Sequence, residues 1–127
     1  MSEKDAPLDA LRRVIRALNA GDNSACLTGM SEKVVIIDDV APFERTGLEE
    51  AEQWLDRLAA LRKQLLATLS LEATDVRVAG NRAYIVAPAI LKGSLVESDL
   101  EMNGVVTSTL IQRNGEWLVS SLVWSKA

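Results

Sequence analysis

The sequence predicts a single α+β domain in which helices from the N-terminal half pack on a curved antiparallel sheet. Two observations predict this class. Apolar residues recur at helical spacing in the first half of the chain, and the spacing changes to alternation from about residue 66 onward. With 127 residues, 48% of them hydrophobic, the chain can bury the core of one domain. We assign residues 1–127 to that domain and expect 1–5 to form a disordered tail.

Two helices are predicted at the start of the chain. Apolar residues from Leu8 to Leu18 recur at helical spacing over residues 7–19. Gly21 follows, and glycine readily takes the left-handed conformation that ends many helices. Asp22 then has the side chain of a good N-cap, so we expect a short second helix directly after it.

A strand and a third helix follow. Residues 34–37, Val-Val-Ile-Ile, form a β-branched run that is too short for a helix and suits a strand. Pro42 interrupts any continuation of that strand. Thr46 and Glu49 have the spacing of a capping box, so we expect a helix that runs to about Lys63.

The last part of the chain predicts an antiparallel meander. Asn114-Gly115 is the strongest short hairpin signal, and it joins predicted strands over 104–113 and 116–125. Another strand is predicted over 83–91, with a looser stretch over 92–103 after it. A sheet of this kind buries one face under the helices.

Composition disfavours several classes of partner and site. The net charge of -4 disfavours nucleic acid, and no apolar run approaches the ~20 residues that span a bilayer. We therefore expect neither nucleic acid nor a membrane as partner. The absence of histidine removes the commonest general base and zinc ligand, and we expect no metal and no cofactor. The single cysteine, Cys26, cannot form an internal disulfide, and we expect a cytoplasmic protein.

Three segments of the N-terminal half stand in an order that resembles a known family. They are Ala17-Leu18-Asn19-Ala20-Gly21-Asp22 at the end of the first helix, Asp38-Asp39 at the end of the strand, and Arg45-Thr46-Gly47 before the third helix. The order resembles the NTF2-like superfamily, and within it the branch of the steroid Δ-isomerases and SnoaL-like cyclases. The resemblance covers residues 7–60. It implies a cone-shaped (cystatin-like) fold with about three helices and an apolar pocket between them and the concave face of the sheet.

The same resemblance implies a candidate acid–base residue. In the isomerases a carboxylate just after the first strand moves a proton on the substrate, and that position is Asp38 here. Desolvation of its charged form in an apolar cone would poise it as a base. Adjacent strand residues point to opposite faces, so Asp39 takes the place of Asp38 if the register shifts by one. Alternatively, either aspartate simply ends the strand by accepting hydrogen bonds from nearby backbone N–H groups.

The chain departs from the isomerases at both positions that donate hydrogen bonds to the developing enolate. The resemblance implies a tyrosine on the first helix and a protonated carboxylic acid on a late strand. This chain has Val14 and Thr107 there. Because the loss of a single such donor typically costs ~10²–10³ in rate, we do not expect steroid isomerisation.

Helical and strand residues on the expected inner side make up the predicted ligand pocket. They are Val14, Leu18, Trp54, Leu58, Tyr84, Val86, Thr107, Thr109 and Trp124. Core packing is the alternative interpretation for the tryptophans, and a solvated hydroxyl at the sheet rim is the alternative for Tyr84. Strand alternation predicts that Trp117 and Trp124 lie on opposite faces.

Three functions fit these expectations. The first, which we favour, is the binding of a small hydrophobic ligand. The second is an isomerase, cyclase or dehydratase in which Asp38 acts as general base on a carbonyl substrate. The third is a non-catalytic dimeric interaction module. Because the last two strands carry apolar residues on both faces, we expect a homodimer through the sheet.

Overall fold

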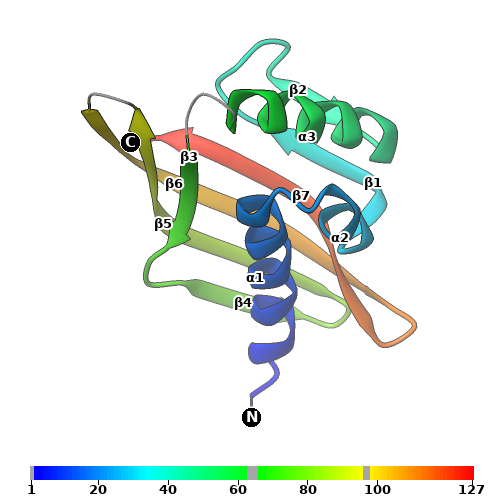
Figure 1. Cartoon of the computed structure of the whole chain (residues 1–127). Coiled ribbons are helices and arrows are strands. Elements are labelled where there is room, and N and C mark those ends of the chain that lie inside the picture. Colours follow the sequence, from blue (N-terminus) through cyan, green and yellow to red (C-terminus); the bar gives the residue numbers. More distant parts are fainter. Residues whose placement is uncertain (1, 63–65, 96–97) are drawn as a thin grey trace.

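The structure, a computed structural model, describes residues 2–62, 66–95 and 98–127 (Figure 1). Its elements are, in chain order, α1 (Asp5–Ala20), α2 (Asn23–Thr28), β1 (Met30–Ile37), β2 (Glu44–Thr46), α3 (Leu48–Arg62), β3 (Leu66–Leu71), β4 (Asp75–Ala79), β5 (Arg82–Leu95), β6 (Ser98–Arg113) and β7 (Glu116–Lys126). The expected order of two helices, a strand, a third helix and a run of strands is confirmed.

The strands form one curved sheet, with α1 and α3 on the same face of it (Figure 1). The strand order is β2-β1-β7-β6-β5-β3, and β4 pairs with the other half of β5. Every pairing is antiparallel except that of β1 with β7, which is parallel. The sheet is therefore mixed rather than wholly antiparallel, because β1 lies beside β7 and runs parallel to it.

The predicted C-terminal end of α1 and the predicted N-terminal end of α2 are confirmed. Gly21 has a φ of 72° and donates its N–H to Leu18 O, which satisfies a carbonyl at the end of α1. The Oδ1 atom of Asp22 accepts a hydrogen bond from Ala25 N at 3.1 Å and so caps α2. Local chemistry is sufficient to set both ends, through the backbone at Gly21 and through the side chain at Asp22.

The hydrogen bond at the start of α3 differs from the predicted capping box in its acceptor, which lies one residue further along the chain. Thr46 belongs to β2, and its N–H donates to Oε1 of Glu50 at 3.1 Å rather than to Glu49. The strand β2 was not predicted. Its three residues pair with the end of β1, with Arg45 opposite Ile36, so that the two strands form a hairpin around residues 38–43.

The looser stretch expected over 92–103 is strand wherever the structure describes it. β5 extends to Leu95 and β6 begins at Ser98, with Lys92 opposite Glu101. This cross-strand pair of opposite charges favours pairing of the polar segment. The predicted Asn114-Gly115 turn between β6 and β7 is confirmed, since both residues have positive φ.

A β-bulge places Trp117 and Trp124 on the same face. Thr109 pairs with Ser121, but the next residue, Leu110, pairs with Val119, which leaves one extra residue in β7. The extra residue reverses the alternation, so both tryptophans face the helices. The prediction that they lie on opposite faces is wrong for this reason.

The core lies between the helices and the concave face of the sheet. Its largest fully buried aliphatic side chains include Leu11, Ile36, Leu55, Ile85 and Leu110, which come from both helices and three strands. Among the described residues, no helix has the length and apolar character needed to cross a membrane.

Candidate ligand-binding site

An apolar cavity of about 450 Å³ lies between the concave face of the sheet, α3 and the end of α1. Its lining residues come from both of these helices, from β1 and the residues that follow it, and from β3, β5, β6 and β7. Among the lining residues in the described ranges, only Asn19, Asp38 and Asp39 are polar. This volume lies within the range of ~300–1,000 Å³ that is usual for small-molecule sites.

Six of the residues singled out from the sequence line this cavity. They are Leu18, Asp38, Asp39, Trp54, Leu58 and Trp124. Asp38 is half-buried, whereas Asp39 is exposed. Both aspartates therefore reach the cavity, although strand alternation predicts that only one does, because they follow the end of β1 and belong to the loop.

Val14 lies in the core and not in the cavity. It is 1% exposed, and its Cγ2 atom would be 2.6 Å from a Cβ atom added at Gly29. The side chain thus fills the contact between α1 and the residue that follows α2. The position that the isomerase resemblance assigns to a tyrosine is occupied here by close aliphatic packing.

Four further residues predicted for the pocket lie on the outer face of the sheet. Tyr84 and Val86 are 48% and 45% exposed, and they stand opposite Thr109 and Thr107 in the pairing of β5 with β6. None of the four lines the cavity. The prediction is wrong because Ala83, Ile85 and Ala87, and not their neighbours, face the core. In a strand a shift of one residue exchanges the two faces.

The hydroxyl group of Thr109 takes part in the β-bulge. Its Oγ1 atom lies 2.8 Å from Ser120 Oγ and 2.7 Å from Ser121 Oγ. These contacts join hydroxyl groups of β6 and β7 at the position where the register shifts. The threonine therefore stabilises the bulge rather than contacting the cavity.

Asp38 is held by three donors from three segments. Its Oδ1 atom accepts from Arg45 Nη1 at 2.7 Å and from Val40 N at 3.1 Å. Its Oδ2 atom accepts from Trp54 Nε1 at 2.9 Å. The Asp38 and Arg45 side chains are only 12% and 6% exposed, so this is a largely buried ion pair.

These contacts change the expected character of the acid. The sequence suggested an aspartate in apolar surroundings, but a cation and two N–H groups replace the water that burial removes. Sequence reasoning missed both Arg45 and Trp54 as partners of Asp38. Opposite charges on either side of a short loop are the one signal that could have indicated the ion pair.

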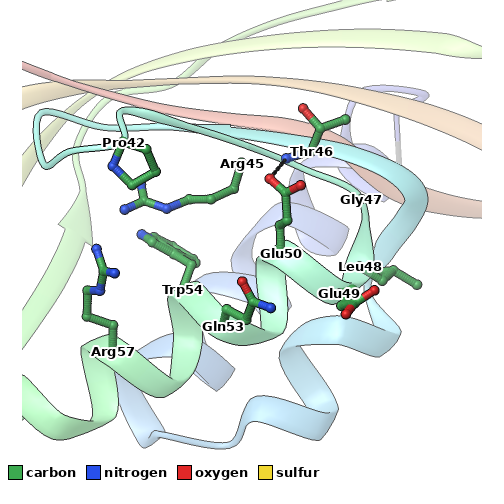
Figure 2. A pocket seen from close by; sticks show the side chains of 10 residues that line it. All are labelled: Pro42, Arg45, Thr46, Gly47, Leu48, Glu49, Glu50, Gln53, Trp54 and Arg57. Atoms are coloured by element: carbon green, nitrogen blue, oxygen red, sulfur yellow. Dashed lines mark hydrogen bonds between the residues drawn. The ribbon is translucent and has the colours of Figure 1, made fainter.

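Trp54 lines both the apolar cavity and a second, more polar groove of about 550 Å³, whose lining residues Figure 2 shows. Figure 2 shows Arg45 extending from β2 across the top of Trp54, which rises from α3. Trp54 lines both spaces, Asp38 lines only the apolar cavity, and Arg45 lines only the groove. On the groove side, Arg57 Nη1 donates to Ala41 O at 3.0 Å, which helps to hold the loop.

Asn19 has a structural role at the cavity wall. Its Nδ2 and Oδ1 atoms bond to Leu69 O and Leu69 N, both at 2.9 Å, and so tie the end of α1 to β3. In the described part of the chain, no group of three or more His, Cys, Asp or Glu side chains is placed to hold a metal ion. Of the two carboxylates that line the cavity, Asp38 is the more deeply buried.

No protein-family model and no curated protein sequence matches the chain. Solved structures do match it. An NTF2-like protein with a cystatin-like fold from Novosphingobium aromaticivorans superposes with a TM-score of 0.82 at 14% identity, covering 98% of this chain and 80% of that one. The chain has the NTF2-like fold.

Two further solved structures that match the chain carry different descriptions. A candidate ketosteroid isomerase from Shewanella frigidimarina matches with a TM-score of 0.78 at 20% identity, covering 94% of each chain. The hub of CaMKII from S. rosetta matches with a TM-score of 0.85 at 16% identity, covering 100% of this chain and 98% of that one. At these identities the likeness shows a shared fold, and the site must decide function.

Proposed function

We propose that this NTF2-like chain binds a small, mainly apolar molecule in the cavity between its sheet and α3. The observation that carries the proposal is the lining itself, in which aliphatic side chains and two tryptophans surround the hydrogen-bonded Asp38. Apolar walls with one placed polar group are typical of small-molecule sites, since the walls supply affinity and the polar group fixes orientation.

Two observations favour binding over proton transfer at Asp38. Val14 is packed in the core and Thr107 lies on the outer face, so neither isomerase-like position supplies a hydrogen-bond donor to the cavity. Asp38 is also tied to Arg45 and Trp54, which hold it as an acceptor in a fixed direction. Proton abstraction from a carbonyl substrate needs a stabilised enolate, and these contacts provide no donor for one.

A side chain that fills the cavity should strongly weaken ligand binding. Ala67 lines the cavity from β3, and a phenylalanine there would occupy the space that the ligand needs. We expect Ala67→Phe to weaken the binding of para-octylanisole, an apolar probe without a hydrogen-bond donor, by more than tenfold. Isothermal titration calorimetry measures this directly.

The matched control is Thr107→Phe, which adds the same ring on the exposed face of β6. This variant should bind the probe within about twofold of the unchanged chain, because the ring lies outside the cavity. Equal loss of binding in both variants would contradict a site in the cavity, as would a full absence of binding in the unchanged chain.

We further propose that two copies of the chain pair through the outer face of the sheet. Tyr84 and Val86 support this, since both are large, nearly half exposed and two residues apart on the same face of β5. Light scattering should give twice the chain mass of 13.8 kDa, and Val86→Lys should return it to a monomer. Leu100→Lys, at an equally exposed apolar residue of β6, serves as the control and should leave the dimer intact. A monomeric mass for the unchanged chain at micromolar concentration overturns this proposal.

A further inference from the structure

The donors around Asp38 leave a defined acceptor for a ligand. A carboxylate offers about four lone-pair positions, two on each oxygen. Oδ1 uses both of its positions, on Arg45 Nη1 and on Val40 N. Oδ2 uses only one, on Trp54 Nε1. Asp38 lines the cavity, and a molecule bound there would use the remaining position on Oδ2.

We propose, resting on the binding function above, that the cavity selects neutral apolar molecules that carry a hydroxyl group. The hydroxyl donates its hydrogen to Oδ2 of Asp38, and the rest of the molecule lies against the apolar walls.

The charge balance at the site excludes the two charged classes. Arg45 already neutralises Asp38, with 2.7 Å between Nη1 and Oδ1, so an ammonium group gains little from the carboxylate. Asp39 also lines the cavity, but it is exposed, so an ion pair with it would add little for an ammonium group, whereas its charge repels an anionic ligand. Either ion would also leave water for a cavity whose other walls are mainly apolar, which costs free energy without a full partner.

Hydrogen-bond polarity excludes a ketone in the same position. A ketone oxygen and Oδ2 are both acceptors, so neither can satisfy the other, and burial of unpaired acceptors is costly. A hydroxyl supplies the missing hydrogen. Bonds to a charged partner are stronger than those between neutral groups, so this contact makes the cavity selective for a hydroxyl group.

Arg45 and Trp54 act as positioning residues in this scheme. They hold the carboxylate from β2 and α3, the two elements that follow the loop in the chain. Because three donors fix the group, the free lone pair keeps one direction, and a ligand need not order it on binding. Their role predicts that ligand preference, and not only stability, depends on them.

A matched series of probes tests the class of ligand. Para-octylphenol, para-octylanisole, para-octylacetophenone and para-octylbenzylamine share an apolar body and differ in one polar group. We expect the phenol to bind about tenfold more tightly than the anisole, since a hydrogen bond to a charged group is worth about that factor. The acetophenone and the benzylamine should bind no better than the anisole, as measured by titration calorimetry at neutral pH.

A double variant should reverse the preference. In Asp38→Asn with Trp54→Phe, the asparagine oxygen still accepts from Arg45 and Val40, which leaves its amide nitrogen in the place of Oδ2. Removing the indole N–H avoids two donors facing each other there. The variant should bind the acetophenone more tightly than the phenol. Trp54→Phe alone keeps the acceptor but removes one of the groups that hold it, so the variant should still prefer the phenol, by a smaller factor than the unchanged chain does.

The outcomes separate this inference from the proposed function. If phenol and anisole bind equally to the unchanged chain, the cavity binds apolar molecules but the hydroxyl assignment is wrong. If none of the four probes binds, the proposed function fails and the inference fails with it. If the double variant does not fold, as judged by circular dichroism, the comparison of phenol with anisole in the unchanged chain and in Trp54→Phe still decides the case.

Discussion

Replacing Asp38 with alanine is expected to lower the free energy of unfolding by about 3–5 kcal/mol, because loss of one partner from a buried ion pair leaves the other charge uncompensated. The Arg45 side chain is only 6% exposed and would keep its charge after the substitution. Trp54 Nε1 would lose its acceptor as well. Urea unfolding followed by circular dichroism measures the change.

The other ion pair in the described part of the chain provides a matched control. The Nη2 atom of Arg77 lies 3.8 Å from Oδ2 of Asp75, and the two side chains are 80% and 66% exposed. Asp75→Ala should change stability by less than about 0.5 kcal/mol, since exposed pairs contribute little. A similar small effect in both variants would show that Asp38 is not held in the way described.

A double variant tests whether the charges themselves stabilise the fold. Asp38→Leu combined with Arg45→Met removes both charges and keeps apolar volume in the wall. Such replacements of a buried pair are often neutral or stabilising, so the double variant should recover most of the loss seen in Asp38→Ala. If it does not, the hydrogen bonds to Val40 and Trp54 carry more of the stability than the ion pair does.

Gly104→Ala is expected to be destabilising by about 3 kcal/mol, the upper part of the usual range for overpacking. A Cβ atom at this position would lie 2.6 Å from Ser125 O and would overlap the ring of Trp124. The ring could move, but the backbone oxygen belongs to the paired strand β7 and could not move without breaking register. Glycine is thus required here by close contact between neighbouring strands.

The same substitution should also change the cavity, because Trp124 lines it. We expect para-octylanisole to bind to Gly104→Ala at least several-fold more weakly, with a shifted tryptophan emission maximum. Adding Trp124→Leu should recover only part of the stability, since the contact with Ser125 O remains. A stability within about 0.5 kcal/mol of the unchanged chain, together with unchanged binding, would contradict the packing described at Gly104.

Local signals in the sequence were sufficient for the turns and helix ends. Gly21, Asp22 and the Asn114-Gly115 pair each act through their own backbone or side chain, and the structure places each as predicted. The amphipathic stripe of α1 likewise needs only residues of one element. Such features are readable because the residues that decide them are close in sequence.

The faces of the central strands were not predictable from the same pattern. In β5, one face has Ala83 and Ile85 and the other has Tyr84 and Val86, so both sets are apolar. Alternation alone could not decide which set faces the helices. The extra residue in β7 also reverses the pattern within a single strand, and nothing in its local sequence marks it.

The contacts of Asp38 were hidden for a different reason. Arg45 reaches Asp38 only because β2 pairs with β1, and this three-residue strand is too short to give a pattern. Trp54 reaches it from α3, 16 residues further along the chain. The sequence could name the aspartate as a candidate, whereas its hydrogen bonds depend on how three elements pack.

A crystal structure of the chain with para-octylphenol tests the central claim most directly. We expect the octyl group to lie between α3 and the concave face of the sheet, and the phenol oxygen to lie within about 3 Å of Oδ2 of Asp38. Arg45 and Trp54 should keep their hydrogen bonds to the same carboxylate. A cavity closed by its own side chains, or a probe bound elsewhere with Asp38 uncontacted, would contradict the account.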